Sequence, residues 1–280
     1  MVNAENVHAH SLVEFADEKP EARESSDHWF ARGQNFAIEW VDVTKAGGAF
    51  EITADEEAMV VLPEIGATIE GQSQKAVAKG RSVCIVPPGT YQVSMAEVGS
   101  CVCLFSDPDK LASPKIVNSD VYETADPRVA PVGKPMKRAD GSTTITVIEI
   151  DGITTEGKNS AMKVLQSATM SINWVERHGV RDRSDLTPHD HPDFEQGSVA
   201  MLGDFIHHLR VPWGKNANLW RDDVHTRANR KSVLISSVGL VHTTEAIENV
   251  QHVLLDVFAP ARQDFIQKGY VANSDDYVMA

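Results

Sequence analysis

Two histidines and a carboxylate lie at alternate positions in one short stretch of this 280-residue chain: His189, His191 and Glu195. Alternate residues of a β-strand point to the same face, so this spacing would bring two imidazoles and a carboxylate together. A third imidazole, His242, follows an apolar segment and a turn of small residues, and a neighbouring strand would carry it to the same point. Three histidines and one carboxylate predict a mononuclear site for a divalent transition metal with open coordination positions.

The segments that must position these residues are short and rich in β-branched or aromatic residues. Gly, Pro, Asp or Asn separates them, and helical periodicity is nearly absent. Strand signals of this kind cover residues 36–43, 58–62, 83–88, 101–105, 143–150, 161–175, 204–211, 232–238 and 252–258. Short strands at near-regular spacing predict an all-β fold, an antiparallel sandwich or barrel.

An internal repeat indicates two copies of this architecture. Residues 102–108 resemble residues 256–260, because each stretch ends a strand-rich block with an aromatic residue and then a proline. Upstream, residues 86–92 align with 236–242, so that Gln92 stands where the second copy has His242. Proline-rich polar sequence separates the copies. We therefore predict an N-terminal arm (1–33), a first barrel (34–107), a connector (108–143) and a second barrel (144–280).

The second copy resembles the cupin superfamily. The first cupin motif, His-x-His followed by Glu and a later Gly, matches His189, His191, Glu195 and Gly203. The second motif, Pro-x-Gly-x-x-His, matches residues 237–242 except that serine replaces the proline. The resemblance implies two jelly-roll barrels in one chain, a bicupin, with a metal bound by His189, His191, Glu195 and His242.

One extra residue between Glu195 and Gly203, compared with the usual motif, leaves the fourth ligand open. A β-bulge after Glu195 would keep the carboxylate on the metal face. A bulge between His191 and Glu195 would turn Gln196 inward as a weaker, neutral ligand. We favour Glu195 because hard divalent ions prefer an anionic oxygen.

The extra residue before Gly203 also decides which side chains of the next strand face the metal. Regular pairing places His208 and Arg210 on the metal face, whereas a bulge before the turn places His207 there instead. One of these groups would then contact a substrate; the alternative is that both histidines are partly exposed strand residues. Glu245 serves either as a ligand or base, or as a solvent-facing residue near the metal.

Four further residues near the second motif have two interpretations. The loop-rich stretch 211–230 either flanks a ligand or plugs one end of the barrel, and its candidates are Trp213, Trp220, His225 and Arg227. His252 alternates with Val250 and Leu254 on the last strand. We interpret His252 as a barrel histidine with satisfied hydrogen bonds rather than as a ligand.

The first copy lacks the histidines of a cupin metal site. Alignment on Glu57 places Glu51, Thr53 and Gln92 at the three histidine positions, and no histidine occurs between His28 and His178. We expect a structural or dimer-forming role for this half, with a metal-free binding pocket as the alternative.

Composition narrows the function. A formal charge of -14 and a pI near 5.2 argue against nucleic acid and anionic membranes as partners. No apolar run approaches the length of a membrane span, and the first residues lack the features of a signal peptide. Three cysteines in strand-like segments fit reduced thiols. These features predict a cytoplasmic protein that acts on a small molecule. We also expect a homodimer.

The resemblance implies a mononuclear non-haem metal enzyme. We expect one divalent metal per chain, iron by analogy, although manganese, nickel, cobalt, copper or zinc would suit the same ligands. The expected activity is a dioxygenase-like oxidation of a small chelating organic substrate, with Arg210 or a histidine at 207 or 208 neutralising a substrate anion. The alternative is a cupin with a structural metal that is non-catalytic or binds a sugar or a small acid. Such a protein would be an isomerase or a sensor.

Overall fold

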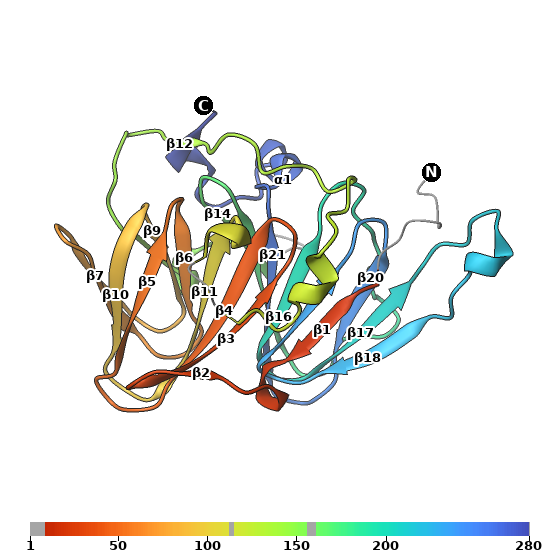
Figure 1. Ribbon diagram of the computed structural model, residues 1–280, viewed down its shortest axis with the longest axis horizontal. Coiled ribbons are helices and arrows are strands. Elements are labelled where there is room, and N and C mark those ends of the chain that lie inside the picture. The colour runs from red at the N-terminus through yellow and green to blue at the C-terminus, as the bar shows by residue number, and fades with distance from the viewer. Residues whose placement is uncertain (1–8, 112–114, 156–160, 280) are drawn as a thin grey trace.

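Two β-barrels lie side by side and account for nearly all of the regular structure (Figure 1). The computed structural model describes residues 9–111, 115–155 and 161–279. The predicted all-β class is confirmed, since the described part of the chain contains a single short α-helix, α1 (Gln263–Gln267). No helix in these ranges is long and apolar enough to cross a membrane.

The N-terminal barrel is built from two antiparallel sheets. Its larger sheet has the order β13 (Thr146–Glu149), β9 (Ser82–Val86), β6 (Ala58–Leu62), β11 (Gly99–Ser106), β4 (Phe36–Val43), β3 (Ser26–Arg32), β2 (Glu21–Ala22). Its smaller sheet has the order β5 (Ala49–Ala54), β10 (Gly89–Met95), β7 (Ala67–Glu70), β8 (Lys75–Ala78).

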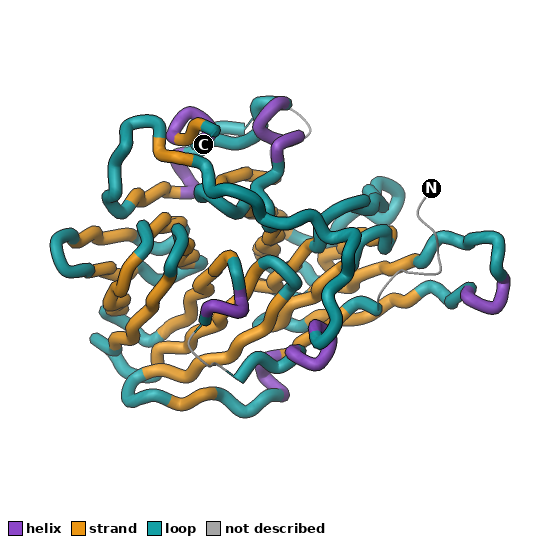
Figure 2. Tube along the Cα trace, turned by 45° about the horizontal axis from the view of Figure 1, so that its top comes forward, coloured by secondary structure: helices purple, strands orange, loops and turns teal. Residues whose placement is uncertain are grey.

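The C-terminal barrel repeats this plan. Its larger sheet has the order β1 (Ser11–Glu14), β19 (Ser232–Ser236), β16 (Gln196–Leu202), β21 (Gln251–Phe258), β15 (Ser171–His178), β14 (Met162–Gln166). Its smaller sheet has the order β18 (Val224–Ala228), β17 (Phe205–Arg210), β20 (Val241–Ala246). The hairpin of β17 and β18 extends away from the barrels at the right of Figures 1 and 2.

Short elements connect the barrels. Strand β12 (Lys137–Arg138) in the connector pairs with β22 (Tyr277–Val278) at the C-terminal end. The described 3₁₀ helices are η2 (Phe15–Asp17), η3 (Pro108–Lys110), η4 (Ser119–Tyr122), η5 (Ile150–Gly152), η7 (Ala217–Leu219) and η8 (Ser274–Asp276).

The larger sheets of the two barrels pack against each other. On β4, Ile38 and Trp40 belong to the cluster between the barrels, together with Ile172 and Trp174 of β15. The alternate residues of β4, such as Val41, face the inside of the N-terminal barrel. Burial on both faces explains why these strands are continuous apolar runs rather than alternating ones.

The barrels exchange their first strands. Strand β1 begins the chain but pairs with β19, so the red strand in Figure 1 lies among the strands of the C-terminal barrel. Strand β13 begins the second copy but pairs with β9 of the N-terminal barrel. Each copy therefore completes the other copy's sheet.

Besides β1, two further strands pair across the predicted boundaries. Strand β3 lies in the range predicted as an arm, yet it pairs along its whole length with β4. Strand β13 lies in the predicted second barrel, yet it completes the first. Local sequence carries the tendency to be a strand but not the identity of the partner strand, because pairing is a long-range contact.

Candidate metal centre

Three histidines form a compact cluster inside the C-terminal barrel. One ring nitrogen from each of His189, His191 and His242 lies within 4.8 Å of the others. The backbone brings them together: the amide of His189 donates to the carbonyl of His242 over 3.1 Å, and the reverse bond is 2.8 Å. The amide of Gly239 donates to the carbonyl of His191 over 2.8 Å, which ties the first motif to the turn of the second.

Hydrogen bonds to backbone carbonyls orient two of the rings. His189 Nδ1 lies 2.9 Å from the carbonyl of Thr187, and His242 Nδ1 lies 2.9 Å from that of Leu240. A carbonyl only accepts, so each Nδ1 carries the proton and each Nε2 keeps a free lone pair. Such outer bonds fix the tautomer and orientation of metal-binding histidines in known sites.

The buried rings are neutral, as metal ligands must be. Burial, followed by repulsion from His242, lowers the pKa of His191 to about 3. Burial also lowers the pKa of His242 to about 4. Metal ions bind the unprotonated imidazole, so neither ring has to lose a proton to bind at neutral pH.

The expectation that the Glu195 carboxylate lies beside these histidines is wrong. Glu195 is buried, but its Oε2 accepts a hydrogen bond from the amide of Gln34 over 2.6 Å, and its Oε1 accepts one from the Tyr122 hydroxyl over 3.2 Å. The alternation rule fails because the chain bends at residues 192–193 and the strand begins only at residue 196.

The Gln196 side chain lies beside the histidine cluster instead. Its Oε1 lies 3.0 Å from His191 Nε2 and 3.3 Å from His242 Nε2. Its Nε2 donates to Ser198 Oγ and to Asp256 Oδ1, each over 3.0 Å, which leaves the amide oxygen directed at the rings. Three imidazoles and one amide oxygen thus form a set of neutral donors that fits a divalent transition metal.

The bulge that the sequence indicated lies later in the strand. Pairing of β16 with β21 shifts register between Ala200 and Leu202, before the turn at Gly203. As expected for a bulge there, His207 faces inward and is buried, and burial lowers its pKa to about 3. His207 Nδ1 lies 2.9 Å from Thr244 Oγ1.

The other pocket candidates lie on the opposite face of the small sheet. His208 Nε2 lies 2.9 Å from Glu245 Oε2, and His208 Nδ1 lies 2.7 Å from His225 Nδ1. Arg210 forms an ion pair with Asp223. Neither the described lining of the central cavity nor the histidine cluster includes these side chains, so they lie outside the cavity beside His189.

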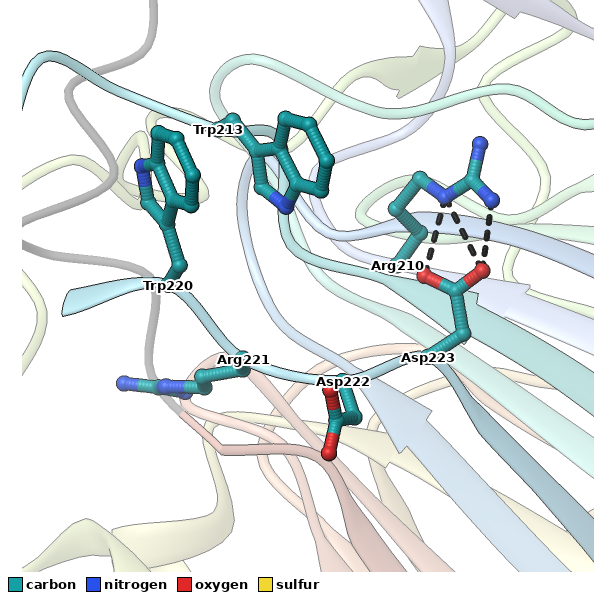
Figure 3. Close-up of a pocket in the computed structure, with 6 residues that line it drawn as sticks. All are labelled: Arg210, Trp213, Trp220, Arg221, Asp222 and Asp223. Carbon is teal, nitrogen blue, oxygen red and sulfur yellow. Dashed lines mark hydrogen bonds and ion pairs between the residues drawn. The ribbon is translucent and has the colours of Figure 1, made fainter. Parts of the chain in front are cut away.

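The predicted tryptophans lie on the projecting hairpin rather than at a barrel end. Figure 3 shows Trp213 and Trp220 stacked next to the Arg210–Asp223 ion pair. Their ring centroids are 4.6 Å apart and the planes differ by 9°, although Trp213 remains 73% exposed. Arg227, on β18 of the same hairpin, pairs with Asp204 before β17 and with Glu248 between β20 and β21.

A cavity of about 680 Å³ opens beside the histidine cluster. Apolar walls come from residues such as Leu254 and Phe258, and polar groups come from β15, β20 and β21. Asp256 lies in this wall, and burial raises its pKa to about 6. A small organic molecule would fit this volume beside a metal ion.

The N-terminal barrel has no corresponding cluster among its described residues. Glu51, Thr53 and Gln92 are exposed, while Ile52 and Val93, which alternate with them, fill the interior. Glu57 is buried but engaged: it accepts hydrogen bonds from Arg138 Nε at 2.6 Å, the Tyr277 hydroxyl at 2.7 Å and the amide of Ala168 at 2.8 Å.

Glu57 and Glu195 therefore have matching roles that sequence reasoning missed. Each accepts an amide of the other barrel and a tyrosine hydroxyl. Both tyrosines end an Asn-Ser-Asp-x-Tyr segment, at 118–122 and 273–277, and this repeat was a signal available in the sequence. The asparagines match too, since Asn118 bonds both backbone groups of Arg32 and Asn273 bonds both of Gln166.

Comparison with known proteins supports the fold. No family model and no curated protein matches the chain. Among solved structures, the oxalate decarboxylase of Lactobacillus farciminis, in a formate complex, is 14% identical at a TM-score of 0.58 and covers 91% of this chain and 86% of its own. A mutant of the Bacillus subtilis oxalate decarboxylase is 13% identical at a TM-score of 0.59, and the match covers 91% of this chain and 78% of that one.

A putative glyoxylate-induced protein from Pseudomonas aeruginosa is 12% identical, with a TM-score of 0.57, and the match covers 90% of this chain and 89% of that one. The predicted resemblance to cupins is confirmed at the level of the fold: the chain folds as two jelly-roll barrels, as these structures do.

Proposed function

We propose that this chain is a mononuclear metal enzyme, with its single centre in the C-terminal barrel, that acts on a small chelating organic acid. The observation that carries the proposal is the convergence of His189, His191 and His242 with the amide oxygen of Gln196 at the wall of a large cavity. A divalent metal held there supplies a Lewis acid with open positions for substrate and for dioxygen or water.

The chain's own residues divide the remaining work. Asp256 and Ser198 hold the Gln196 amide in one orientation. Asp256 also lines the cavity, and its pKa of about 6 suits a group that gains and loses a proton near neutral pH. Phe194 and Phe258 pack against the His191 ring and exclude water from that side.

The donor set bears on the substrate. Four neutral donors leave the full charge of a divalent ion uncompensated, and an anionic chelating group such as a carboxylate or an enolate would neutralise it. Oxalate and formate, named for the similar structures, belong to this class of small acids. Dioxygenase-like oxidation, iron as the metal, a homodimer and a cytoplasmic location remain predictions.

Metal analysis of the purified, reconstituted protein is the first test, and we expect close to one ion per chain. Oxygen uptake by the iron-loaded protein with chelating organic acids, and with catechol-like and 1,2-diketone compounds for comparison, then tests dioxygenase-like activity. Substoichiometric metal that is unchanged in His189→Ala and His242→Ala variants would rule out the metal centre. Stoichiometric metal without oxygen uptake would instead favour chemistry that needs no oxygen.

A further inference from the structure

The cavity wall contains a buried polar side chain that the metal centre does not use. His252 on β21 is 1% exposed and lines the cavity, but neither of its ring nitrogens has a hydrogen-bond partner among the described residues. The expectation that His252 is a barrel histidine with satisfied hydrogen bonds is wrong. An unpaired buried polar group costs free energy, so a ligand that pairs with it is favoured.

A cationic side chain lies directly across from His252. Arg177 on β15 pairs with His252 in the antiparallel ladder, and such opposite residues point to the same face. Arg177 also lines the cavity, is exposed, and has no hydrogen-bond or ion-pair partner within the described ranges. A free guanidinium beside an imidazole suits a carboxylate, which guanidinium binds in a bidentate manner.

Two neighbouring charged side chains of the cavity rim, Arg181 and Asp182, are already engaged. Arg181 donates to the carbonyl of Thr244 over 2.8 Å and to Thr187 Oγ1 over 3.0 Å. Asp182 accepts bonds from both the amide and the hydroxyl of Ser184. Arg177 is thus the cation of this rim that can turn to a ligand.

The fold does not require this pair. Trp40 of β4 corresponds to Trp174 of β15, since each indole donates to the carboxylate two residues later, Asp42 or Glu176. By this alignment the ladder pair Val43–Gly99 in the N-terminal barrel corresponds to Arg177–His252. Neither Val43 nor Gly99 has a polar side chain, so the polar pair belongs to the barrel with the histidine cluster.

The pair lies away from the metal end. Asp256, which bonds Gln196, stands four residues from His252 on the same strand. At about 3.3 Å per residue, the two positions are roughly 13 Å apart. The long Arg177 side chain covers part of this distance, so a six-carbon acid reaches from the histidine cluster to the guanidinium, whereas a two-carbon diacid is too short to reach both ends.

We propose that Arg177 and His252 form a second subsite that binds a carboxylate of the substrate. The substrate is then an elongated acid, with a chelating group at the histidine cluster and a carboxylate at the opposite end of the cavity. This assignment rests on the proposed function, because it names the substrate class of the same cavity.

Two six-carbon 2-oxo acids test the subsite. 2-Oxoadipate and 2-oxohexanoate share the chelating end and differ only in the distal carboxylate. Calorimetric titration of each into the manganese-loaded and the metal-free full-length protein should show at least tenfold tighter binding of 2-oxoadipate. The Arg177→Val variant, which installs the residue of the N-terminal barrel, should remove the difference and leave 2-oxohexanoate binding unchanged.

Arg221→Val is the matched control, since Arg221 is an exposed arginine of the projecting hairpin outside the cavity. Its preference for the diacid should equal that of the wild type. His252→Phe reports on the imidazole and should reduce the preference while retaining the metal.

The subsite would be overturned if the wild type bound the two acids with equal affinity. It would also be overturned if neither acid bound to the manganese-loaded or to the metal-free protein. A preference that survives Arg177→Val would also overturn it. Metal content is measured in the same samples, so a loss of the metal centre is seen separately. If no metal binds, the metal-free titrations alone decide the subsite.

Discussion

The inside of the N-terminal barrel is closed by apolar side chains, whereas the inside of the C-terminal barrel holds a cavity of about 680 Å³. Both barrels use the same strand order, and both hold their buried glutamate by an amide of the neighbouring barrel and a tyrosine. The difference lies in the inward-facing residues: where the first barrel has Cys103, the second has Asp256. The shared framework therefore serves stability, and function depends on a small set of inward side chains.

The metal ligands should show the largest contrast between the barrels. His242→Ala should lower metal affinity roughly a thousandfold, more than the 10–100-fold typical of losing an outer-shell partner. Gln92→Ala, at the aligned position of the first barrel, should leave metal content unchanged. Elemental analysis and competitive chelator titration measure both. Equal losses in the two variants would show that the N-terminal barrel contributes to the centre.

The packed interior should respond more strongly to truncation than the hollow one. Ile69 is fully buried in the N-terminal barrel, and Ile69→Ala should lower the free energy of unfolding by roughly 3 kcal/mol. Leu254 lines the cavity, and Leu254→Ala should cost only about 1 kcal/mol because fewer packing contacts are lost. Chemical denaturation followed by circular dichroism measures both, and equal costs would contradict the contrast.

Variants of Gln196 and Glu195 should affect different properties, metal binding in the first case and the contact between the barrels in the second. Gln196→Ala should weaken metal affinity by roughly tenfold, about 1.4 kcal/mol, because an oxygen donor is lost. Glu195→Gln should leave metal affinity unchanged but lower stability, since the carboxylate bonds Gln34 and Tyr122. If only Glu195→Gln weakened metal binding, the fourth-donor assignment would be wrong.

The projecting hairpin should contribute least. Its loop, residues 211–223, corresponds to the short loop 71–74 between β7 and β8. Replacing the long loop by the short one should keep metal content and change the free energy of unfolding by no more than about 1 kcal/mol, because loop-closure entropy depends weakly on length. A large loss of metal or stability would show that the stacked tryptophans support the barrel.

The fold and most of the cluster could be predicted from local patterns. His-x-His spacing and a Gly-x-x-His turn identified His189, His191 and His242, since each of these signals spans only a few residues. The orientation of Glu195 could not be predicted in this way. Side chains alternate only inside a strand, and Pro192 interrupts the strand before Glu195.

Contacts between segments far apart in the sequence could not be predicted either. The sequence did not show that β1 and β13 change places, although both begin a copy with similar residues, Ser11–Glu14 and Thr146–Glu149. The hydrogen-bond state of His252 depends on which side chains surround it in three dimensions. Alternation placed it inside the barrel but could not report that its neighbours leave it unpaired.

The strand exchange has a consequence for how this chain can be cut and produced. A fragment that starts after residue 25 lacks β1, and its β19 becomes an open edge with unpaired amides and carbonyls. Such an edge is a template for pairing with other chains. Shortened forms of either copy should therefore associate or aggregate when expressed alone. Co-expression of both fragments would supply the missing strands in trans, so that soluble protein is recovered from two separate polypeptides.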